Sequence, residues 1–75
     1  MAKFKTIINL KGCDKEKVRE MCRKIREKDD TFQFFFNGRY LVLISENKDK
    51  AYKRGIIFVK KYLKGYDLGF EVAKQ

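Results

Sequence analysis

The sequence contains no histidine and only two cysteines, Cys13 and Cys22. Structural zinc sites take four ligands, drawn mostly from cysteine and histidine, so this composition predicts no metal site. A helix that begins near Asp14 would separate the two cysteines by roughly 13 Å along its axis. A disulfide tolerates a Cα spacing of about 7 Å at most. We therefore expect two free thiols and no bound metal.

The absence of histidine also removes the usual base for a cysteine nucleophile. Cys13 follows Gly12 at the start of an expected helix, where a thiol pKa is lowered, but the neighbouring Asp14 opposes formation of a thiolate. The Lys11-Gly12-Cys13 segment lacks the pattern of a phosphate-binding P-loop. We therefore expect no enzymatic activity and no cofactor.

Long apolar runs are missing as well, and none approaches the roughly 20 residues that span a bilayer. The first five residues, Met1 to Lys5, lack the apolar segment of a secretory signal. Together these features predict a cytoplasmic protein that does not enter a membrane. The 75 residues suffice for one domain with one small core, so we expect a single α+β domain over residues 1–75.

Two segments have the apolar spacing of amphipathic helices. Residues 14–28 begin at Asp14, an expected N-cap, and repeat apolar residues every three to four positions. A second helix is expected from about residue 48 to residue 64. Gly65 would end it by adopting the left-handed conformation that is common just after a helix.

The remaining segments alternate apolar and polar residues, as strands do. Strands are expected at 3–10, on both sides of Asn37-Gly38 within 31–44, and at 66–74. Asn-Gly suits a two-residue type I′ turn. The resulting β-α-β-β-α-β order predicts a ferredoxin-like α+β sandwich, with two helices on one face of an antiparallel sheet of strand order 4-1-3-2.

A two-residue turn at Asn37-Gly38 would place Phe34 opposite Leu41 and Phe35 opposite Tyr40. Opposed residues share a face of the sheet, so the turn also decides which side chains face the helices. The expected core side carries Phe32, Phe34, Phe36, Leu41 and Leu43. The expected open sheet face, which is apolar at its centre, carries Lys5, Ile7, Phe35, Tyr40, Val42 and Ile44.

An apolar open face has three interpretations. Its aromatic side chains could stack on the bases of a single-stranded nucleic acid. It could instead contact another protein, including a second copy of this chain in a homodimer. It could also be ordinary surface, because much of any folded surface is apolar. The sequence leaves all three open.

The net charge of +9, from 19 basic and 10 acidic residues, indicates a polyanionic partner or a bias toward solubility. The excess lies mainly in residues 48–64, where a helical wheel separates an apolar arc from a basic arc. The apolar arc holds Ala51, Tyr52, Gly55, Ile56, Phe58, Val59, Tyr62 and Leu63. The opposite arc, called the basic stripe below, holds Lys50, Lys53, Arg54, Lys60, Lys61 and Lys64, with Ile57 among them.

These features predict a small basic binding module that contacts DNA or RNA phosphates through the basic stripe, with weak sequence selectivity. One alternative is a protein-protein interaction module. It would be either a homodimer through the open sheet face or a small inhibitor, of the phage or mobile-element type, that docks on an acidic protein. A designed ferredoxin-like protein without natural function and a merely solvated lysine surface are the remaining alternatives.

Overall fold

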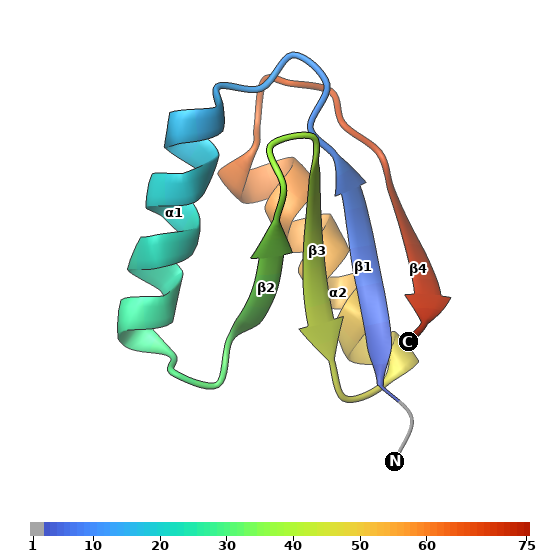
Figure 1. The fold of residues 1–75 in the computed structure, drawn as a ribbon. Coiled ribbons are helices and arrows are strands. Elements are labelled where there is room, and N and C mark those ends of the chain that lie inside the picture. Colours follow the sequence, from blue (N-terminus) through green and yellow to red (C-terminus); the bar gives the residue numbers. More distant parts are fainter. Residues whose placement is uncertain (1–2) are drawn as a thin grey trace.

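The computed structural model describes residues 3–75, and its helices and strands follow the predicted order (Figure 1). The elements are β1 (Phe4–Asn9), α1 (Lys15–Lys28), β2 (Gln33–Phe36), β3 (Tyr40–Ser45), α2 (Lys48–Ile57), η1 (Phe58–Tyr62) and β4 (Phe70–Lys74). Element η1 is a π-helical turn that continues α2. None of the helices in the described residues is long and apolar enough to cross a membrane.

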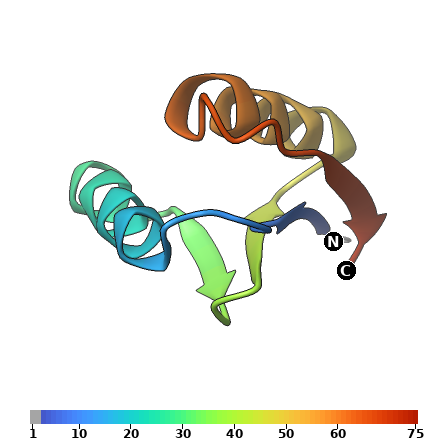
Figure 2. The same ribbon diagram turned by 90° about the horizontal axis from the view of Figure 1, so that it is seen from above.

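The four strands form one antiparallel sheet in the order β2-β3-β1-β4. Both helices lie on the same side of this sheet, as the view from above shows (Figure 2). The predicted α+β class and strand order are therefore confirmed. The other side of the sheet carries no helix from the described part of the chain.

Helix α1 begins and ends at two aspartates. Asp14 is the N-cap, as predicted, because its Oδ1 accepts hydrogen bonds from the backbone N–H groups of Glu16 and Lys17 at 3.0 and 3.4 Å. At the other end, Asp29 Oδ1 accepts hydrogen bonds from the N–H and the hydroxyl of Thr31. These bonds fix the chain where it leaves the helix and turns toward β2.

Helix α2 lies close to the sheet. Its N-cap is Asn47, whose Oδ1 accepts a hydrogen bond from the Lys50 N–H at 2.9 Å. The buried Thr6 hydroxyl on β1 donates a hydrogen bond to the Ala51 carbonyl at 2.7 Å. A Cβ on Gly55 would overlap the Phe70 ring, so this close approach to β4 requires glycine. These contacts hold α2 against the centre of the sheet.

The turn between β2 and β3 differs from the prediction. Gly38 and Arg39 are its central residues, and the Asn37 N–H donates a hydrogen bond to the Tyr40 carbonyl at 3.3 Å. Gly38 has φ of +88°, as the first central position of a type II′ turn requires. Asn37 lies just before the turn, where its Oδ1 accepts hydrogen bonds from the N–H groups of Arg39 and Tyr40. The predicted Asn37-Gly38 type I′ turn is therefore wrong by one position.

Moving the turn by one position shifts the pairing between β2 and β3 by two residues. Phe34 pairs with Leu43 and Phe35 with Val42, so the predicted pairs with Leu41 and Tyr40 are wrong. Side chains alternate with a period of two, so a shift of two leaves every residue on the face expected of it. The predicted core and open sides of the hairpin are confirmed.

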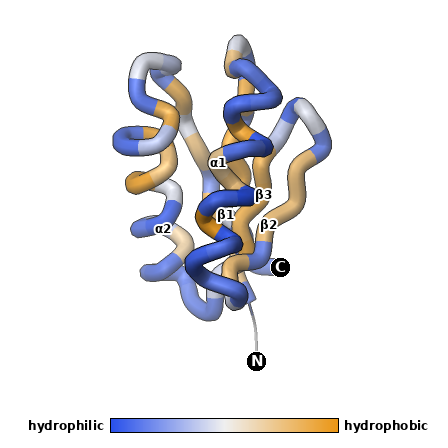
Figure 3. Tube along the Cα trace, turned by 90° about the vertical axis from the view of Figure 1, so that its left-hand side faces the viewer, coloured by the Kyte–Doolittle hydropathy of each residue, from blue (hydrophilic) through white to orange (hydrophobic). Residues whose placement is uncertain are grey.

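The core lies between the helices and the sheet, and β1, α1, β3 and η1 all contribute to it. Its most buried side chains are Ile8, Val18, Cys22, Phe32, Leu41 and Leu43. Figure 3 shows the contrast between the hydrophobic strands β2 and β3 and the largely hydrophilic α1. Strand β4 begins at Phe70 and not at 66 as predicted, because Asp67 has a positive φ of 50° that interrupts extended structure.

Candidate nucleic-acid interface

Most of the predicted basic stripe is exposed along α2, η1 and the turn that follows η1. Residues spaced by three or four positions share one side of a helix, and Lys53, Ile57 and Lys61 follow this spacing. The exposed members of the stripe, called the lysine face below, are Lys50, Lys53, Lys60, Lys61 and Lys64. Ile57 lies among them with 45% of its surface exposed.

Arg54 does not belong to the exposed surface, and the prediction is wrong for this residue. Its side chain is half-buried, and its Cζ lies 5.6 Å from the centroid of the Phe32 ring. The hydrogen bonds that Asp29 accepts from the Thr31 hydroxyl and N–H lower its carboxyl pKa, and the charge of Arg54 adds to this shift. Arg54 therefore points toward β2 and the end of α1, since a guanidinium group stacks favourably on an aromatic ring.

The π-helical turn changes which residues face the core. The Leu63 N–H donates a hydrogen bond to the Phe58 carbonyl, five residues back, at 2.7 Å. A π-helical turn holds more residues than an α-helical turn, so the residues after it are rotated back around the axis. Leu63 is consequently 3% exposed and Tyr62 is 43% exposed. The predicted apolar arc is wrong for Tyr62, and also for Tyr52 and Ile56, which are exposed.

The lysine face is electrostatically one-sided. No acidic residue occurs between Lys50 and Tyr66 in the sequence. Glu46, which precedes the helix, lies 3.2 Å from Lys50 Nζ, but this ion pair is exposed and such pairs contribute about 1 kcal/mol at most. Lys61 Nζ lies 5.8 Å from the centroid of the Tyr62 ring, a contact that leaves its charge uncompensated.

Helix α1 provides a comparison within the same molecule. Its basic residues are interleaved with Glu16, Glu20 and Glu27, and Arg23 Nη2 lies 2.8 Å from Glu20 Oε1. Opposite charges at this spacing offset each other along the helix surface. The positive charge of α1 is thus divided by acidic residues, whereas that of the lysine face is continuous.

The predicted open sheet face brings its residues together in rows across the strands. Phe35, Val42 and Ile7 form one row that ends at Glu71. Ile44 and Lys5 lie in the next row, between Gln33 and Ala73. Phe35 is 63% exposed, and Tyr40 is also exposed near the turn. This arrangement could stack on bases or contact an apolar protein surface, and Glu71 would oppose a phosphate at the edge.

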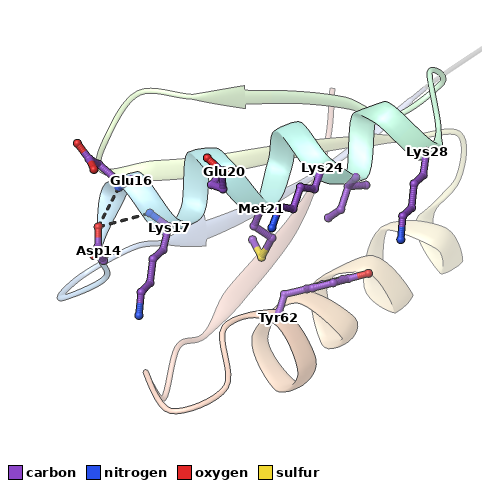
Figure 4. A pocket seen from close by; sticks show the side chains of 9 residues that line it. Asp14, Glu16, Lys17, Glu20, Met21, Lys24, Lys28 and Tyr62 are labelled. Atoms are coloured by element: carbon purple, nitrogen blue, oxygen red, sulfur yellow. Dashed lines mark hydrogen bonds between the residues drawn. The ribbon is translucent and has the colours of Figure 1, made fainter.

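Sequence reasoning missed a groove between α1 and η1, with a volume of about 630 Å³. Figure 4 shows Met21 of α1 and Tyr62 of η1 facing each other across it. The acids Asp14, Glu16 and Glu20 line one part, and the bases Lys17, Lys24 and Lys28 also line the groove. Its charges therefore balance, which disfavours a polyanion. No sequence signal identifies the groove, because it depends on the rotation of Tyr62 by the π-helical turn.

The two thiols are free, with Cys22 buried and Cys13 partly buried. Burial raises the pKa of the Cys13 thiol above its ordinary value and raises the pKa of Cys22 to about 11. A protonated thiol is a weak nucleophile, so neither side chain is activated in this fold. Among the described residues, no three His, Cys, Asp or Glu side chains lie together in a way that could hold a metal ion.

No protein-family model, no curated protein and no solved structure matches this chain. Its function must therefore be inferred from its own surface.

Proposed function

We propose that this protein is a small basic, non-enzymatic binding module that contacts nucleic-acid phosphates through the lysine face. We also propose that its fold is of the ferredoxin-like type, because the order of its elements and strands follows that pattern. The observation that carries the functional proposal is the continuous exposed positive charge of α2 and η1, which no acid interrupts after Asp49.

Phosphate contacts explain this arrangement better than contact with a particular base sequence. Each lysine that neutralises a phosphate releases condensed counterions, so affinity depends strongly on salt and weakly on sequence. Lysine side chains are long and mobile and adapt to a backbone of either DNA or RNA. The exposed Ile57 would lie at the centre of the contact and exclude water there.

The test is a salt-titrated binding measurement with fluorescently labelled single- and double-stranded oligonucleotides of random sequence. We expect Lys53→Gln with Lys60→Gln to weaken binding by about tenfold or more. For duplex DNA, the slope of log affinity against log salt should become shallower by about 0.9 for each phosphate that the variant no longer neutralises. Circular dichroism would confirm that the variant remains folded.

The matched control is Lys17→Gln with Lys24→Gln on α1, because it changes the net charge by the same amount at exposed positions. We expect this pair to change affinity by less than about threefold, since α1 lies outside the proposed contact. Equal losses for the two pairs would show that overall charge alone drives binding, and would contradict a specific lysine face.

A second candidate function is a protein-protein contact through the open sheet face, which the 63% exposure of Phe35 favours. A row of Phe35, Val42 and Ile7 is unusually apolar for a sheet face exposed to water. Light scattering at high protein concentration tests the homodimer form. A dimer that dissociates on the substitution Phe35→Asp would support the homodimer. A monomeric unsubstituted protein would exclude the homodimer.

A further inference from the structure

A cavity of about 370 Å³ lies where β2 begins, β3 ends and α2 begins. Its lining includes Lys3, Lys50 and Arg54, and also Thr31, Ser45 and Glu46. The three cations exceed the single carboxylate by two charges. This part of the surface is separate from the outer end of the lysine face, which is formed by Lys60, Lys61 and Lys64.

Two buried polar atoms belong to residues that line this cavity. Ser45 is 5% exposed, and neither its Oγ nor Arg54 Nη1 forms a hydrogen bond with another described residue. Leaving a buried polar group without a partner is costly, and such groups are rare in folded proteins. Both groups can donate a hydrogen bond and both belong to residues that line this cavity, so an anion that enters it would satisfy them once their side chains rotate toward it.

The local helix geometry also favours an anion. Lys50 and Arg54 lie four residues apart on α2, so they project from neighbouring turns of the same side. The cavity lies at the N-terminal end of α2, where the helix dipole is positive. The opposing carboxylate, Glu46, is already paired with Lys50 Nζ, and this exposed ion pair can rearrange at little cost.

We propose that this cavity binds a phosphate group, held by Arg54, Lys50, Lys3 and the Ser45 hydroxyl. A phosphate offers several acceptor oxygens to these converging donors, and arginine matches its geometry well. The group could be inorganic phosphate or the terminal phosphate of an oligonucleotide. The second source rests on the proposed function, whereas the first does not.

The first experiment titrates isotope-labelled protein with inorganic phosphate and follows its NMR spectrum, with sodium chloride at equal ionic strength as the reference. We expect phosphate-specific shifts at the Ser45 amide and the Arg54 side chain, and a higher melting temperature than in chloride. Shifts spread evenly over all lysines would overturn the proposal, because they would indicate general screening only.

Variants give changes of opposite sign, which separates binding from folding. Ser45→Ala removes an unpaired buried hydroxyl, so it should raise the melting temperature without phosphate and reduce the stabilisation by phosphate. Glu46→Gln removes the competing carboxylate and should increase that stabilisation. Arg54→Met keeps an unbranched apolar stem but removes the guanidinium, so it should abolish the stabilisation by phosphate. Lys24→Gln on α1 is the control and should leave the stabilisation by phosphate unchanged. A full phosphate effect in both Ser45→Ala and Arg54→Met would contradict the proposal.

A pair of oligonucleotides that differ only in a 5′-phosphate distinguishes the two sources. If the terminal phosphate is the ligand, the phosphorylated form should bind several-fold more tightly, and Arg54→Met should remove this difference. Lys53→Gln with Lys60→Gln should weaken both forms equally. Equal binding of the two forms, together with the inorganic phosphate effect, would assign the cavity to free phosphate. Loss of the phosphate effect with oligonucleotide binding intact would refute the cavity and leave the proposed function standing.

Discussion

Helices α1 and α2 lie on the same side of the sheet, yet they present different surfaces. Seven basic residues occur in residues 14–28 and seven in residues 48–64, but the first segment also contains four acids and the second only Asp49. In α1 the acids are distributed along the helix, and Glu20 pairs with Arg23. The comparison shows that the acidic residues, more than the number of basic ones, decide whether a helix presents a positive surface.

The two helices also differ in how they are attached to the sheet. Helix α1 packs on β2, which is an edge strand, whereas α2 packs on β1, β3 and β4. Thr6 and Phe70 contact α2 at Ala51 and Gly55. The surface proposed to bind nucleic acid is thus carried by the helix with more contacts to the sheet, which fixes where the lysine side chains begin while their ends stay mobile.

The largest expected effect tests this difference in attachment. Gly55→Val would drive the new side chain into the Phe70 ring, and overpacking of this kind costs about 2 kcal/mol. The measurement is urea denaturation. Arg26→Val, at an exposed site on α1, should cost less than about 1 kcal/mol. Combining Gly55→Val with Phe70→Ala should cost less than the sum of the two changes, and simple additivity would show that no clash exists.

A second prediction introduces an acidic residue into the lysine face, so that the charges of α2 become interrupted as they are on α1. Ile57→Glu would place one carboxylate within one turn of Lys53, Lys60 and Lys61. We expect oligonucleotide affinity to fall about tenfold, or about 1.4 kcal/mol, while the stability of the fold changes little because Ile57 is exposed. Ile57→Gln serves as the uncharged control. If both substitutions reduce affinity equally, the apolar contact of Ile57 matters and the interruption of charge does not.

The smallest expected effect concerns how readily α1 and α2 open locally. Burial raises the pKa of Cys22 to about 11, so this α1 thiol is protonated at neutral pH and should react with Ellman's reagent only when α1 opens. A matched probe is Ala51→Cys in a background of Cys13→Ser and Cys22→Ala, because Ala51 is equally buried but lies on α2. We expect the opening free energy at Cys22 to be lower by about 1 kcal/mol. A lower opening free energy at position 51 than at Cys22 would show that α2 is the less firmly held helix, and would contradict the comparison.

The order of the elements was sufficient to predict the strand order. The alternation of apolar residues was sufficient to predict the two faces of the hairpin, because it is a strong local signal. It failed on the exact pairs because the Asn37 side chain accepts hydrogen bonds from Arg39 and Tyr40 and so occupies the position before the turn. The face assignment remained correct only because the resulting shift was of two residues.

Predictions failed where distant segments decide the outcome. A helical wheel assumes 3.6 residues per turn, so it placed both Tyr62 and Leu63 on the apolar arc. It could not anticipate that the π-helical turn would expose Tyr62 while Leu63 stays buried. It also could not place Arg54 over Phe32, which belongs to another part of the chain. The exposed lysines were predictable because lysine is almost never buried without a partner.

The most direct test of the lysine face is an NMR map of the isotope-labelled protein with a short single-stranded oligonucleotide at low salt. We predict that the largest shifts occur at Lys53, Lys60, Lys61 and Lys64, and that they disappear at high salt. Shifts confined to Phe35, Tyr40 and their neighbours on the open sheet face, with α2 and η1 unchanged, would contradict the account.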